Sequence, residues 1–111
     1  MRLSPYIRQI LEDTNSIKYV SLISAWEIAI KMSHKKLHLE GGIAEFYRMV
    51  ESNGFLWLPL QKQYIDIITS LPFIHKDPFD RLIIATAQYE KMSLITADSN
   101  IHQYDVDWVW C

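Results

Sequence analysis

The chain has 111 residues, of which 50% are hydrophobic and 22% are charged, and its formal net charge is −2. This composition is typical of a globular domain and excludes a disordered chain. The small negative charge excludes a global basic field for nucleic acid, so a polyanionic partner needs another source of positive charge, such as a divalent metal ion. The sequence has no repeat and no linker rich in glycine, serine or proline, so we expect one domain over residues 1–111.

The cysteine content and the hydropathy of the sequence indicate the cell compartment of the protein. The single cysteine, Cys111, cannot form an internal disulfide, which suits a reducing cytoplasm. No apolar stretch approaches the roughly 18 residues of a membrane span, and the opening MRLSPYIRQI lacks the apolar region of a signal peptide. We therefore expect a cytoplasmic protein without a membrane partner.

Helical and extended patterns alternate along the first half of the chain. We expect a helix from Ser4 to about Glu12 and a short strand over 18–22. A second helix is expected through SLISAWEIAIKMSHKKL, with Ser24 as its N-cap and Glu27 completing a capping box. A third helix is expected through IAEFYRMVES, followed by a buried strand in FLWLPL that stops at Pro59.

The second half continues the alternation. We expect a short helix over 61–70, a loop over 71–76, and a helix that Asp77 caps and that runs to about Lys91. SLITA and VDWVW are predicted strands. Strands that alternate with helices predict an α/β fold with a mainly parallel sheet and right-handed crossovers.

Three acidic residues fall where such a sheet binds ligands, outside the carboxyl ends of its strands. Glu27 follows the first predicted strand, Asp80 lies in the first turn of the helix that leads into SLITA, and Asp98 directly follows SLITA. Each also suits a helix start or a turn. Together, however, three carboxylates at one edge repel one another unless a cation lies between them. Mg²⁺ or Mn²⁺ prefers such ligands and can activate water against a phosphodiester.

Other polar residues give weaker signals. His34 and His38 have the i,i+4 spacing of a metal pair on a helix, but no third ligand is evident. His75, Lys76 and Arg81 surround the two aspartates of HKDPFDR and are candidates for positioning phosphates. There is no glycine-rich phosphate loop and no nucleophile with a neighbouring base.

Three segments, VSLISAWEIAIKMSHKKL, HKDPFDRLIIATAQ and LITADSNIHQYDV, resemble PIN-domain ribonucleases, and within them the VapC-type toxins of bacterial toxin–antitoxin pairs. The likeness runs from about residue 3 to residue 110. It implies a three-layer α/β/α sandwich and a metal-dependent endoribonuclease that uses Mg²⁺ or Mn²⁺. It also implies an RNA substrate and a cognate antitoxin that blocks the site. The family's acidic roles carry over to Glu27, Asp80 and Asp98, with Asp77 as an accessory residue.

The resemblance has one departure. Members of this family open with a strand that ends in an aspartate, in a D-T-H or D-T-S sequence, and this aspartate is a principal metal ligand. The chain shows no such segment, and Asp13-Thr14 follows a predicted helix instead. Without that central strand, two strand edges lose their partner, and open edges invite association. We expect the halves to close up, another chain to fill the gap, or a homodimer or higher oligomer to form.

Two rival functions follow from this departure and from the fold class. A catalytically impaired PIN-like protein could bind an antitoxin or RNA without cleaving. A phosphate-accepting signalling domain is also α/β with clustered acids, but it needs an aspartate after a mid-chain strand, and FLWLPLQK offers none.

Overall fold

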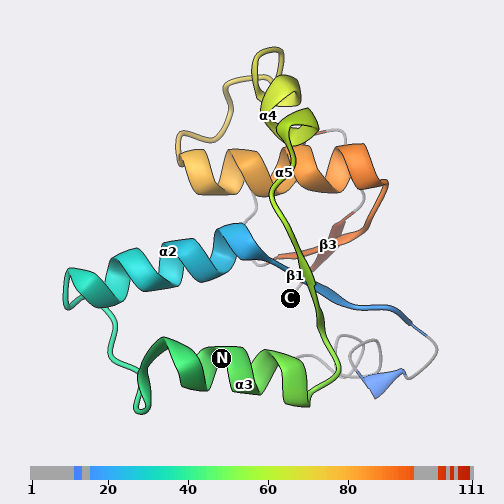
Figure 1. The fold of residues 1–111 in the computed structure, drawn as a ribbon. Helices are drawn as coiled ribbons and strands as arrows, with labels where there is room; N and C mark the ends of the chain where they lie inside the picture. Colours follow the sequence, from blue (N-terminus) through green and yellow to red (C-terminus); the bar gives the residue numbers. More distant parts are fainter. Residues whose placement is uncertain (1–11, 14–15, 97–102, 105, 107, 111) are drawn as a thin grey trace. The chain divides into compact units, whose positions relative to one another are not determined.

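The computed structural model describes residues 12–13, 16–96, 103–104, 106 and 108–110. Within this part, four helices and four three-residue strands follow one another in the predicted order (Figure 1). They are β1 (Tyr19–Ser21), α2 (Leu22–Ser33), α3 (Gly42–Ser52), β2 (Leu56–Leu58), α4 (Lys62–Ile68), α5 (Pro78–Glu90), β3 (Leu94–Thr96) and β4 (Trp108–Trp110). The helix predicted from Ser4 lies almost entirely outside the described residues. No helix in the described ranges is both long and apolar enough to cross a bilayer.

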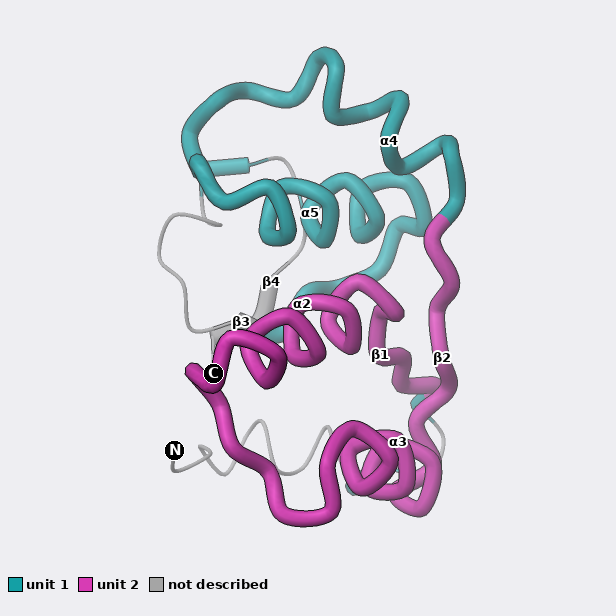
Figure 2. Tube along the Cα trace, turned by 60° about the vertical axis from the view of Figure 1, so that its left-hand side comes forward, with its two compact units in different colours: residues 1–16, 61–111 teal, residues 17–60 magenta. Residues whose placement is uncertain are grey.

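The chain divides into two compact units, one of residues 17–60 and one of residues 1–16 and 61–111 (Figure 2). In the 17–60 unit β1 pairs in parallel with β2, with Tyr19 opposite Leu56. In the 61–111 part of the other unit β3 pairs in parallel with β4, with Leu94 opposite Trp108. The predicted parallel pairing is therefore confirmed. The single domain over residues 1–111 stays a prediction.

β1 runs into α2 without a loop, and this corrects the predicted helix start. Ser21 has an extended backbone (φ −69°, ψ 138°), and its hydroxyl accepts from the amide of Ile23 at 3.0 Å. Ser21 is therefore the N-cap, and the prediction of Ser24 was wrong. Ser24 lies in the first turn and Glu27 in the second, so no capping box forms. A serine at the strand end already satisfies a free amide of the helix, so the helix starts three residues earlier.

α2 also ends earlier than predicted, at Ser33. The amide of His34 donates to the carbonyl of Ile30, and Lys35 then takes a left-handed backbone conformation (φ 59°). This turn ends the helix before His38. His34 and His38 therefore do not share one helix face, and the weak signal of their i,i+4 spacing does not correspond to a pair on a helix.

An aromatic cluster joins α3 to β2. The rings of Phe46 and Tyr47 meet the ring of Trp57 edge-on, with centroids 6.0 Å and 5.6 Å away. The indole Nε1 of Trp57 donates to Oε2 of Glu51 on α3 at 3.0 Å. Val50, on the same helix, is buried. Apolar side chains of this helix thus pack against β2.

In the unit of residues 1–16 and 61–111 (unit 1 in Figure 2), α4 packs against α5 through Tyr64, whose side chain is fully buried. The Tyr64 hydroxyl donates to Oε2 of Glu90 at 2.5 Å, and the ring meets Tyr89 edge-on at 5.7 Å. Burial, together with this bond, raises the pKa of Tyr64 to about 12. The Tyr64 hydroxyl therefore stays protonated around pH 7, and its hydrogen bond links α4 to the C-terminal end of α5.

The hydrophobic core of this unit lies between α5, the loop before it and the segment after β3. Its buried members are Leu71, Ile84 and Tyr104. The partly buried side chains of Ile67, Ile74, Leu94 and Val106 pack against them. The core thus joins the loop that carries the HKDPFD sequence to residues about 30 positions further along the chain.

Candidate functional site

The site is built from the start of α5, where the sequence HKDPFD turns from loop into helix. Asp77 has an extended backbone (φ −71°, ψ 118°), and its Oδ1 accepts from the amides of Phe79 at 2.8 Å and Asp80 at 3.2 Å. Pro78 occupies the first helical position, where its missing N–H costs nothing. The predicted N-cap is confirmed. Asp77 therefore acts on the backbone of the helix.

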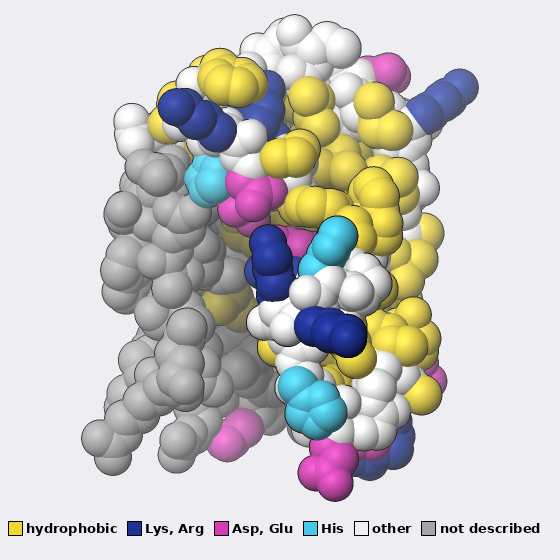
Figure 3. All heavy atoms as spheres, turned by 90° about the vertical axis from the view of Figure 1, so that its left-hand side faces the viewer, with side chains coloured by type: hydrophobic (Ala, Val, Ile, Leu, Met, Phe, Trp, Pro, Cys, Tyr) yellow, Lys and Arg dark blue, Asp and Glu magenta, His cyan; other side chains and the backbone are white. Residues whose placement is uncertain are grey.

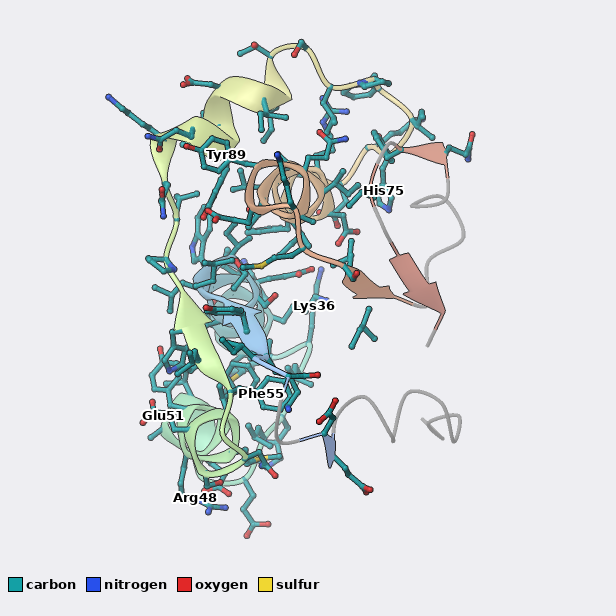
Figure 4. The ribbon with its side chains drawn as sticks, turned by 90° about the vertical axis from the view of Figure 1, so that its right-hand side faces the viewer. Lys36, Arg48, Glu51, Phe55, His75 and Tyr89 are labelled. Atoms are coloured by element: carbon teal, nitrogen blue, oxygen red, sulfur yellow. The ribbon has the colours of Figure 1, made fainter. Side chains whose placement is uncertain are left out.

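Asp80, three residues after the cap, has a different surrounding. Its side chain is 39% exposed, and its Oδ2 lies 3.2 Å from Nε2 of His75. The His75 side chain is only 14% exposed, and its Nδ1 accepts from the amide of Asp77 at 3.1 Å. Figure 4 shows His75 beside α5. The structure thus brings together Asp77, Asp80 and His75, three of the residues that the sequence predicted.

Tyr104 fixes the main chain just before the cap. Its hydroxyl accepts from the amides of Ile74 at 3.0 Å and His75 at 2.7 Å, and its side chain is buried. Sequence reasoning missed this residue, because a contact across 29 positions leaves no local signal. The role of His75 had a signal in the spacing H-x-D-x-x-D, which places an imidazole next to the first turn of the helix.

Arg81 points into the protein and holds the loop before α5. Its residue is 7% exposed, and its guanidinium donates to the carbonyls of Pro72 (3.0 Å), Leu71 (3.3 Å) and Ile68 (3.4 Å). Its Cζ also lies 4.6 Å from the centroid of the Phe73 ring. These contacts use the cation inside the protein, so we correct the predicted phosphate-binding role of Arg81 to a structural one.

The other predicted residues have simpler surroundings. Lys76 is exposed, and its predicted contact with phosphate stays a prediction. Glu27 belongs to α2, in the 17–60 unit, and its Oε2 lies 3.4 Å from Nζ of Lys31. The two side chains are 27% and 53% exposed, so water screens this pair strongly. Asp98 lies outside the described residues.

The donor chemistry suits a hard metal ion, although the described residues do not complete a site. Glu27 and Asp80 both present partly exposed carboxylates, which are the ligands that Mg²⁺ and Mn²⁺ prefer. Among the described residues, however, no three His, Cys, Asp or Glu side chains gather as a metal site. A site built on Glu27, Asp80 and Asp98 stays a prediction.

Two lysines, Lys35 and Lys36, place positive charge in the turn after α2. His34, Lys35, Lys36 and His38 all lie in this turn and are exposed. Figure 3 shows Lys, Arg and His side chains, with acidic side chains among them, on the face that it turns toward the viewer. A chain of net charge −2 therefore still presents a local cationic surface in its 17–60 unit.

Comparison with known families decides the fold family. The sequence matches the family model of the PIN domain over residues 4–107. The chain belongs to the PIN domain family. Comparisons with curated proteins and with solved structures gave no match. The α/β fold predicted for this PIN domain is confirmed, and the family indicates a nuclease-type fold and hence the hydrolase class.

Proposed function

We propose that this PIN domain is a metal-dependent endoribonuclease and the toxin of a VapC-type toxin–antitoxin pair. The observation that carries the proposal is the Asp80 carboxylate, which is partly exposed and held by His75 at the capped start of α5. Asp80, Glu27 and Asp98 are the carboxylates that would bind Mg²⁺ or Mn²⁺. The family match supports the nuclease class, and the metal, the RNA and the antitoxin are proposals.

The start of α5 suits a reaction at a phosphodiester for two reasons. A fixed carboxylate offers its oxygens at a defined place, so less free energy is lost in ordering it when a cation binds. The positive end of the helix dipole also favours the negative charge of Asp80 and of a nearby phosphate. A bound metal ion would lower the pKa of its water and so supply the nucleophile.

Substrate binding needs positive charge, because the chain as a whole is slightly acidic. Lys76, next to the cap, and Lys35 and Lys36, in the exposed turn after α2, are the cationic groups that we assign to the RNA backbone. Contacts of this kind recognise phosphates and not bases, so they would bind RNA without selecting a sequence.

A second function has support from the sheets. In the described residues each sheet has only two strands of three residues, and a two-stranded sheet of this size is marginal by itself. A two-stranded sheet of this size would gain stability by pairing with a strand of another chain. The alternative is therefore a PIN domain that binds an antitoxin or RNA without cleaving it, as a homodimer or higher oligomer.

The deciding experiment is RNA cleavage by the full chain in Mg²⁺, in Mn²⁺ and with a chelator, for wild type and Asp80→Asn. Asp66→Asn, which changes an exposed aspartate on α4, is the matched control. We expect metal-dependent cleavage that is lost in Asp80→Asn and kept in Asp66→Asn. Cleavage that survives Asp80→Asn would contradict the site. A folded sample without cleavage that captures a partner protein would favour the binding alternative.

A further inference from the structure

We propose that His75 is a positioning residue, which donates a hydrogen bond to Asp80 and so sets the direction of the carboxylate. This inference rests on the proposed function, in which Asp80 is a metal ligand. The observations behind it are a hydrogen bond from the Asp77 amide to Nδ1 of His75 and a distance of 3.2 Å between Nε2 of His75 and Oδ2 of Asp80.

The main chain selects the tautomer of the imidazole. A neutral imidazole has one nitrogen that donates and one that accepts. The amide of Asp77 donates to Nδ1 at 3.1 Å, so Nδ1 carries the lone pair and the ring proton is on Nε2. Nε2 lies 3.2 Å from Oδ2 of Asp80, so this proton is directed at the carboxylate. A backbone amide thus determines which nitrogen of His75 faces Asp80.

The main chain that carries the imidazole is also held in place. The amide of His75 donates to the buried hydroxyl of Tyr104 at 2.7 Å, and Arg81 binds the carbonyls of the preceding loop. The side chain is 14% exposed, which leaves it little room to turn. A fixed donor restricts the carboxylate that accepts from it. Partners that hold a ligating carboxylate in this way change metal affinity by roughly 10–100-fold when they are removed.

A purely structural role for His75 predicts a different outcome from a positioning role, and two variants separate the roles. In His75→Asn, the amide oxygen takes the place of Nδ1, which keeps the bond from Asp77 and removes the donor to Asp80. In His75→Gln, the longer side chain brings an NH₂ group near the place of Nε2, which keeps the donor to Asp80. A purely structural role predicts that His75→Asn stays closer to the wild-type Mn²⁺ affinity, whereas a positioning role predicts that His75→Gln does.

The experiment measures Mn²⁺ affinity of the full chain by electron paramagnetic resonance. The variants are His75→Asn, His75→Gln and Asp80→Asn, with the exposed His38→Asn as control. We expect His75→Asn to weaken Mn²⁺ binding about 10-fold, and His75→Gln and His38→Asn to stay close to wild type. Without metal, the imidazole nitrogen-15 spectrum of wild type is expected to show the proton of His75 on Nε2. Thermal melting confirms that each variant is folded.

The outcomes separate this inference from the function on which it rests. If Asp80→Asn loses Mn²⁺ while His75→Asn binds it like wild type, His75 does not position the ligand and the inference is overturned. A proton on Nδ1 overturns it as well. If Asp80→Asn leaves Mn²⁺ affinity unchanged, the proposed metal site itself fails, and His75 is then no positioning residue for it. If His75→Asn is unfolded, the Mn²⁺ affinity of His75→Gln and the spectrum decide.

Discussion

The starts of α5 and α2 differ in how firmly they hold a predicted acidic ligand. At α5, Asp77 caps two amides, His75 contacts Asp80, and Arg81 binds the preceding loop. At α2, the described contacts of the acidic residue are local, because Glu27 faces Lys31 one turn away. The start of α5 also depends on a residue far along the chain, Tyr104, which binds the amide of His75. The described contact of Glu27 on α2, in contrast, lies within one helix turn.

The carboxylates of Asp80 and Glu27 therefore differ in how firmly they are held before a cation binds. A carboxylate fixed by its neighbours defines where a cation binds, and it costs little entropy to order. A carboxylate in an exposed ion pair can leave its partner at small cost, because water screens the pair. Asp80 is therefore fixed by its neighbours within its own unit, whereas Glu27 can change its conformation at small cost within the 17–60 unit.

The largest loss of stability at the start of α5 is expected when Arg81 is replaced. Arg81→Met keeps the aliphatic stem but leaves the carbonyls of residues 68, 71 and 72 without their charged donor. We expect the free energy of unfolding to fall by about 2–4 kcal/mol, measured by urea denaturation. Arg81→Lys is expected to recover less than half of the loss, because one ammonium cannot serve three carbonyls in a planar fork.

Arg48→Met is the matched control for Arg81. Arg48 is 64% exposed and pairs with Glu45 on the surface of α3, which raises the pKa of Arg48 through the side-chain bond. We expect the stability of this variant to stay close to wild type. Equal losses in Arg81→Met and Arg48→Met would contradict the structural role of Arg81.

Replacing the two helix caps tests the same difference between α5 and α2, with a smaller expected loss of stability. Asp77 accepts from two amides, whereas Ser21 accepts from one. We expect Asp77→Ala to lower the free energy of unfolding by about 1–2 kcal/mol and Ser21→Ala by about 0.5–1 kcal/mol, in parallel thermal melts. Asp77→Asn should keep most of the stability, since asparagine also caps well. A larger loss of stability in Ser21→Ala than in Asp77→Ala would contradict the stronger cap that we assign to the start of α5.

The smallest effect is expected at the ion pair of α2. Lys31→Gln removes the partner of Glu27 and should lower the free energy of unfolding by about 0.3–0.5 kcal/mol. Glu27→Gln should cost a similar amount of stability, but in the proposed function it should also weaken Mn²⁺ binding. Calorimetry of Mn²⁺ binding to both variants checks this. Equal affinities would remove Glu27 from the site.

The sequence predicted well what depends on neighbouring residues. The order of helices and strands in the described part, the parallel pairing and the cap at Asp77 all follow from periodicity, turn residues and helix-start rules. The motif D-P-F-D-R led to the PIN family, which the match over residues 4–107 confirms. The start of α2 was misplaced, because Ser21 and Ser24 are both good caps and the choice depends on where the strand ends.

The roles of side chains that act over a distance could not be predicted. Arg81 follows the two aspartates and resembles a phosphate ligand in sequence, but its acceptors are carbonyls up to 13 residues earlier. Tyr104 has no sequence feature that connects it to His75. Burial, which decides both cases, is a property of the packed unit and not of the local pattern.

The bond from Tyr104 to the loop before α5 has a consequence for synthesis on the ribosome. Its hydroxyl binds amides 29 and 30 residues earlier, so this loop lacks one of its anchors until Tyr104 has emerged. A nascent chain that already carries Asp80 therefore has not yet fixed the segment in front of it. Assembly of the candidate site therefore follows the synthesis of Tyr104, because part of its support is encoded after its acidic residue.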